Sequence, residues 1–252
     1  MRAACLLLAA GVLAATVSAD AQRAPAATAT LLPADVQALA CAPGLAYEKP
    51  PTPLRVTGGQ DSVVRRTYQQ GDFITINAGT DNGIEAGQEY YVRRLQGMNA
   101  GDISRANPGI IRTAGWIRIY ATDRTMSLAT ITHACDTVEV GDYLETFVLP
   151  TVPAISTERL AAQRDNYGRI IGGSDRRRSF GQNDLFIVDR GSNHGVSVGS
   201  RFVVYKDKQV KGNFLFEVGE AAAVEVRPET STLQALITRD ALTAGDYVAL
   251  RK

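Results

Sequence analysis

The chain is poor in the residue patterns that enzymes use for acid–base, nucleophilic and metal chemistry. Its 252 residues include only two histidines, His133 and His194, and three cysteines. It contains no Walker phosphate loop and no His-Glu-x-x-His zinc helix. These absences predict a protein that is not an enzyme and that carries no cofactor.

A surplus of charge and long apolar runs are lacking as well. The formal net charge is +1, and nucleic-acid binding rests on clustered cationic contacts to phosphate, so no nucleic-acid partner is expected. The densest basic run, Arg176–Arg178, is interpreted as a solvated turn. After the first residues no stretch reaches the roughly eighteen apolar residues of a membrane span, so the mature chain is expected to have none.

Residues 1–21 have the pattern of a secretory signal peptide. The uncharged run Leu6–Ala15 is too short to cross a bilayer, and Ala19-Asp20-Ala21 fits an A-x-A cleavage site. A second site lies after Ala19, so the mature chain is expected to begin at Gln22 or Asp20. An uncleaved anchor helix is the competing interpretation. Cleavage predicts a periplasmic or otherwise exported protein.

The cysteines fit an oxidising compartment. Cys5 would be removed with the signal peptide, which leaves Cys41 and Cys135 as an even pair and predicts a disulfide between them. Two buried free thiols are the alternative. A metal site built on His133 and Cys135 is the weaker interpretation, because two ligands at that spacing do not define one and Cys135 is used by the disulfide.

A repeat of turn glycines organises the remaining sequence. Gly79, Gly83 and Gly87 recur 112 residues later, and Gly115 and Gly141 recur 104 residues later. The later counterparts are Gly191, Gly195, Gly199, Gly219 and Gly245. The difference of eight is explained by an insertion near residues 97–109 of the first copy, which has loop composition. The pattern predicts an internal duplication.

Each copy has the signature of β-structure. Short runs rich in β-branched and aromatic residues alternate with glycine-bearing turns, and helical periodicity is scarce. The runs are Phe73–Ile76, Tyr90–Arg93, Ile117–Ile119, Leu185–Val188 and Phe202–Tyr205. The predicted fold is all-β, with two tandem small barrel- or sandwich-like modules and an extended N-terminal arm.

The domain boundaries follow from composition. Residues 22–56 are rich in Ala, Thr and Pro and are predicted to form the arm. The first β module spans 57–148 and the second spans 168–252. Between them, residues 149–167 form a linker with a short helix expected over Ser156–Arg164.

Four acids recur at equivalent places of the two copies. Asp72 matches Asp184, and Asp142 matches Asp246, each at or just before an expected strand. Such acids are expected to hold duplicated turns through local backbone hydrogen bonds rather than to catalyse. His194 is expected to serve its turn in the same way, because its counterpart in the first copy is Asn82.

Aromatic residues of the first copy offer a candidate binding face. Tyr90, Tyr91 and Trp116 could present their rings to a ligand, whereas aromatic residues in strands more often belong to a core. Both interpretations stay open on the sequence alone.

The second copy in particular resembles a known kind of module. Asp184 through Gly199, then Gly219 and Gly245-Asp246-Tyr247, are similar to the β modules that follow LysM domains in bacterial envelope proteins. They also resemble the C-terminal domain of flagellar assembly protein T. With the export signal, the resemblance implies a non-catalytic binding or scaffolding protein of the cell envelope, an accessory of a larger assembly, whose partners are other envelope proteins. A peptidoglycan- or carbohydrate-binding module is the alternative, and an envelope hydrolase comes third.

Overall fold

The computed structural model describes residues 34–50, 53–97, 102–155, 157, 160–163, 166–174, 177–209 and 214–251. The predicted signal peptide and residues 22–33 of the predicted arm lie outside them. Strands make up 48% of the structure, which confirms the predicted all-β class. None of the helices in the described residues is long and apolar enough to cross a membrane.

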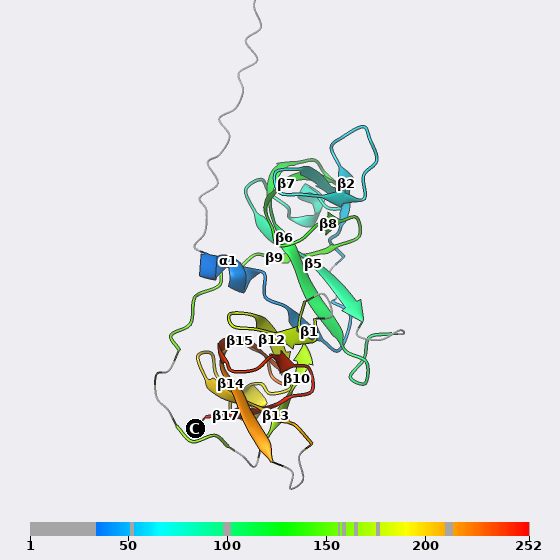
Figure 1. Cartoon of the computed structure of the whole chain (residues 1–252). Coiled ribbons are helices and arrows are strands. Elements are labelled where there is room, and N and C mark those ends of the chain that lie inside the picture. The colour runs from blue at the N-terminus through cyan, green and yellow to red at the C-terminus, as the bar shows by residue number, and fades with distance from the viewer. Residues whose placement is uncertain are drawn as a thin grey trace, which may run out of the picture. The chain divides into compact units, whose positions relative to one another are not determined.

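The first β region is an antiparallel sheet whose two ends approach each other (Figure 1). Its strands, in spatial order, are β2 (Val56–Gly59), β4 (Phe73–Ile76), β7 (Ser127–Ala134), β6 (Gly109–Thr122), β5 (Glu89–Gly97) and β9 (Tyr143–Thr146). A bridge between Arg55 and Tyr143 joins β9 to the residue before β2. A separate ribbon pairs β3 (Thr67–Tyr68) with β8 (Val138–Glu139), and β1 (Gly44–Ala46) pairs with β6.

The second β region is a closed six-stranded barrel. Its strands, in spatial order, are β10 (Gly168–Gly172), β12 (Leu185–Val188), β15 (Ser231–Thr238), β14 (Leu215–Val226), β13 (Arg201–Asp207) and β17 (Tyr247–Leu250). A ribbon of β11 (Ser179–Phe180) and β16 (Leu242–Thr243) accompanies it. The barrel closes because β17 pairs with both β13 and β10.

The two regions share strand order and register. Tyr91 lies opposite Trp116 on β5 and β6, and Val203 lies opposite Glu220 on β13 and β14. The offsets are 112 on the first strand and 104 on the second, as the repeat in the sequence predicts. Each of these strand pairs also has a bulge at the same place, after Val92 and after Val204. The structure therefore bears out two β units with one pattern of connections.

Each region encloses its own apolar core. Ile74, Ile117 and Leu144 are fully buried in the first, and Phe186, Phe202 and Leu233 are fully buried in the second. These residues alternate with outward-facing residues along their strands, which is the period of two that a half-buried sheet requires. The side chains that face outward are thus left to differ between the two copies.

Two local expectations differ from the structure. A helix, α1 (Ala34–Ala40), lies in the segment that was predicted to be extended. Asp35 stands in its first turn, where a carboxylate favours the positive end of the helix dipole. The helix predicted over Ser156–Arg164 is not found in the described residues of that segment, where Ala162 instead bridges to Arg251.

Candidate functional site

The repeated glycines form matched turns. Thr80–Asn82 and Ser192–His194 are single turns of 3-10 helix. They end at Gly83 and Gly195, whose φ angles of 76° and 78° belong to the left-handed region that favours glycine. Gly87 and Gly199 follow with φ angles of 91° and 86°. At Gly79 and Gly191, a Cβ would lie 2.0 Å and 2.1 Å from the backbone oxygens of Asp123 and Arg227.

The repeated acids stabilise further turns, each by accepting a hydrogen bond from the backbone amide three residues before it. Asp72 accepts from the amide of Gln69, and Asp184 accepts from the amide of Gly181, each at 2.8 Å. Asp142 and Asp246 accept from the amides of Glu139 and Thr243 at 2.8 Å and 2.7 Å. The prediction that they serve the turns is confirmed. Each carboxylate also pairs with a different cation, and the four acids lie at four separate turns rather than at one centre.

His194 has the same task as Asn82. Its Nδ1 accepts a hydrogen bond from the amide of Gly191 at 3.2 Å, and the side-chain oxygen of Asn82 accepts one from the amide of Gly79 at 3.3 Å. The turn role expected for this histidine is confirmed.

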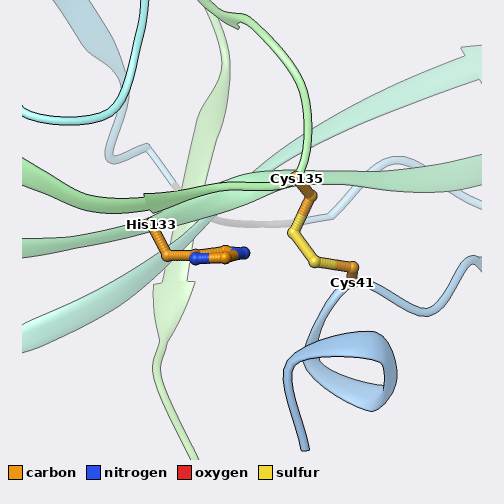
Figure 2. Close-up of side chains that lie close together, drawn as sticks. All are labelled: Cys41, His133 and Cys135. Carbon is orange, nitrogen blue, oxygen red and sulfur yellow. A yellow bond between two sulfur atoms is a disulfide. The ribbon is translucent and has the colours of Figure 1, made fainter. Parts of the chain in front are cut away.

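The predicted disulfide joins Cys41 to Cys135, with 5.7 Å between their Cα atoms. Cys41 comes directly after α1, and Cys135 comes directly after β7. Figure 2 shows the imidazole of His133 beside the two sulfurs. The bond fastens the segment around α1 to the outer face of the first β region.

A cluster of aromatic side chains packs against the disulfide and the segment around α1. Trp116 stacks on His133 with 4.3 Å between ring centroids and on Phe147 at 5.3 Å, and Tyr91 contacts Phe147 at 4.7 Å. Trp116 is 5% exposed and Tyr91 is 6% exposed, and Ala40 of α1 packs with both. These two rings are therefore covered in the present conformation.

Tyr90, the third aromatic of the candidate face, lies apart from this cluster. It packs partly buried against the core on the other face of β5, and its hydroxyl donates to the side chain of Gln88 at 2.8 Å. The structure thus brings together only two of the three predicted aromatics. Burial raises the pKa of both Tyr90 and Tyr91 above the ordinary tyrosine value.

Sequence reasoning missed His133 and Phe147 as members of the cluster. His133 lies opposite Trp116 because the hairpin of β6 and β7 turns between Thr122 and Ser127. Counting outward from that turn would have located the pair. No sequence signal singles out Phe147, which is the first residue after β9.

The same cluster contains the one group of three metal-ligand residue types found among the described residues. Cys41, His133 and Cys135 each offer a ligand atom, and these atoms lie within 4.8 Å of one another. Zinc binds cysteine as a thiolate, whereas both sulfurs here are bonded to each other. Burial lowers the pKa of His133, so its imidazole favours the neutral form. In the oxidised state the arrangement is a covalent clamp beside a stacked histidine.

The equivalent face of the second region has different chemistry. Glu220, at the position of Trp116, pairs with Arg201 and with Arg251, and the three side chains are 7%, 14% and 15% exposed. Arg251 also donates to the carbonyl of Leu160 at 2.8 Å, and the amide of Gln163 donates to the carbonyl of Leu250 at 2.8 Å. The linker therefore covers a buried ion network where the arm covers aromatic rings.

No family model matches the chain, and no curated protein matches it.

Proposed function

We propose that this protein is a non-catalytic binding or scaffolding protein of the bacterial cell envelope, an accessory of a larger assembly, exported through the predicted signal peptide. The proposal draws on the resemblance of the second copy to the β modules that follow LysM domains and to the C-terminal domain of flagellar assembly protein T. Its partners would be other envelope proteins.

The observation that carries the proposal is the use of the polar side chains in both copies. The repeated acids and His194 accept hydrogen bonds from the backbone of their own turns. An acid–base pair must instead converge on one reacting group, with its two pKa values set apart. Two β regions with hydrogen-bonded turns support a role in presenting surfaces to other proteins.

A carbohydrate- or peptidoglycan-binding module is the second candidate. Aromatic rings of the first region favour it, because sugar rings stack on exposed aromatic faces. Trp116 and Tyr91 are covered by the segment around α1, so glycan binding there would require that segment to leave. The protein-binding candidate needs no such opening.

One paired experiment separates the two candidates. The exported, oxidised chain is crosslinked in cells and its bound proteins are identified, while the purified chain is sedimented with isolated cell wall. A scaffold retains a defined set of envelope proteins and stays in the supernatant. Co-sedimentation with the wall, without a defined set of proteins, would support the glycan-binding module instead. Release of soluble wall fragments by the purified chain would show a hydrolase.

A further inference from the structure

Strand β6 extends beyond its neighbour β7, and a strand from the arm covers the extension. Pairing of β6 with β7 begins at Gly115. On the same side, before that point, β1 pairs antiparallel with β6, with Leu45 opposite Ile110 and Gly44 opposite Ile111. Leu45 packs with Ile110, which is 4% exposed, and Ile187 of β12 belongs to the same buried cluster. The free backbone of the β6 extension is thus paired and its apolar side chains are covered.

Strand β14 has the same extension. Gly219, the counterpart of Gly115, begins the pairing of β14 with β15. Before Gly219, β14 pairs with β13 alone, with Leu215 opposite Asp207 and Glu217 opposite Tyr205. Within the described residues no strand pairs with the other side of residues 214–217, which we call the β14 edge. By the offset of 104, Phe214 and Leu215 correspond to Ile110 and Ile111.

The β14 edge exposes Phe214, whose counterpart Ile110 is buried. Phe214 is 65% exposed and Phe216 is 40% exposed, and as alternate residues they point to one face of the strand. Natural proteins usually protect a strand edge with charge, a bulge or a covering segment, because an open edge pairs with other chains. Charged groups lie beside this edge, since Glu217 pairs with Arg239 and Lys208 lies over the ring of Phe216, but no described strand covers it. The two aromatics are therefore available for contact with another chain.

The segment that precedes the second region does not reach this edge in its described residues. In the first region the preceding segment supplies β1. In the second, Ala162 bridges to Arg251, and Gln163 bonds to Leu250 at the end of β17. Within the described residues, the linker is thus engaged on another strand and the β14 edge has no covering segment.

The geometry points to the β14 edge as a strand-addition site for an extended segment of another envelope protein, in which an aliphatic residue lies between two small ones. The sequence Gly44-Leu45-Ala46 shows the chemistry that fits: small residues let the backbones approach, and the aliphatic residue would lie opposite Phe214, as Leu45 lies opposite Ile110. Main-chain hydrogen bonds supply affinity in such complexes and the alternate side chains supply specificity. The inference rests on the proposed function and gives it a site.

A second copy of the chain is the less suitable occupant. The strand of this composition in the described residues is β1, and it is already paired with β6. Cys41, three residues before β1, is bonded to Cys135. Supplying β1 to a neighbour would strip the first region of its own cover.

The probe for the test is a fluorescein-labelled peptide with the sequence of Ala42–Glu48, titrated into the full exported chain with its disulfide intact and followed by anisotropy. Saturable binding is expected, and Phe214→Ser with Phe216→Ser should weaken it by about tenfold or more, since the paired side chains supply the specificity. Val63→Ser with Val64→Ser is the matched control, because those side chains are 71% and 94% exposed at another loop and should leave binding unchanged.

A second peptide tests strand addition without altering the protein. N-methylation of Gly44, Leu45 and Ala46 removes the amide donors and keeps the side chains, so its binding should be lost. The unmodified peptide should slow amide hydrogen exchange at Leu215–Glu217. Equal binding of the methylated peptide, or unchanged exchange at those residues, would overturn the proposal.

Self-association that disappears in the Phe214→Ser, Phe216→Ser variant would also overturn it, in favour of a second copy as the occupant. Failure of the peptide tests leaves the crosslinking result of the proposed function unaffected. The two proposals can therefore fail separately.

Discussion

The two β regions share their inner framework and differ on one outer face. At the position where the first has Trp116, stacked under an arm clamped by a disulfide, the second has Glu220, paired with two arginines under a linker. Register, bulges and turns agree between the two. Because interior side chains and turns must fit one another, they tolerate few changes, whereas a covering segment can be held by unrelated chemistry.

The largest effect on stability should come from loss of the disulfide that holds the segment around α1 on the first region. Cys41→Ser opens a loop that spans a sequence separation of 94 residues. In the chain-entropy model such a bond contributes roughly 4 to 5 kcal/mol to the stability of the fold that it closes. The sole tryptophan, Trp116, lies in the first region, so denaturation followed by its fluorescence reports this loss directly. An unchanged midpoint would show that packing alone holds the arm.

The next largest effect on stability should come from breaking the buried ion network of Glu220 in the second region. Glu220→Gln leaves two largely buried arginines without their carboxylate, and breaking such a buried network costs about 3 kcal/mol. Glu217→Gln is the matched control, because its pair with Arg239 is exposed and should contribute less than about 1 kcal/mol. Calorimetry of both variants checks the comparison. Equal losses would mean that burial of the network does not determine its contribution.

A matched pair of glycines tests whether the linker packs against the second region. Gly87 and Gly199 both have positive φ, but a Cβ on Gly87 meets nothing within 4 Å, whereas one on Gly199 would lie 2.4 Å from the carbonyl oxygen of Ala154 in the linker. Gly87→Ala should cost about 1 kcal/mol from backbone strain alone. Gly199→Ala should cost about 2 kcal/mol, because the linker must also move. Equal costs, measured by calorimetry, would place the linker away from this turn.

The smallest effect should be a pH dependence confined to the first region. Burial lowers the pKa of His133, so the unfolded chain binds its proton more readily than the folded chain does. The resulting stability is complete above the unfolded pKa of about 6.5 and is lost as the pH falls below it. His133→Gln should flatten this dependence in Trp116 fluorescence melts. A slope that persists in the variant would assign it to other groups.

Much of the framework could be predicted because it depends on local chemistry. Glycine, asparagine and aspartate specify turns through the backbone conformations they tolerate, so the equivalent positions of Gly79 and Gly191 in the repeat predict matched turns. Strands β4 and β12 begin and end at the predicted residues. The disulfide followed from counting two cysteines in the expected mature chain.

The packing of the segment around α1 and of the linker could not be predicted, because it depends on contacts between segments far apart in the sequence. Helix α1 has seven residues, and a helix of that length is marginal in water unless it packs on something. Nothing local to Tyr91 or Trp116 shows that Ala40 lies on them. The helix expected over Ser156–Arg164 was based on propensity, whereas the described residues of that segment bond to the end of β17.

The most direct test compares amide hydrogen exchange of the oxidised and the reduced chain. It asks whether the disulfide holds the segment around α1 independently of the ion network that holds the linker. Reduction breaks the bond between Cys41 and Cys135 and leaves the network around Glu220 intact. Exchange should become faster in α1 and β1 and stay unchanged in β14 and β17. Faster exchange in β14 or β17 as well, or no change in α1, would contradict this account.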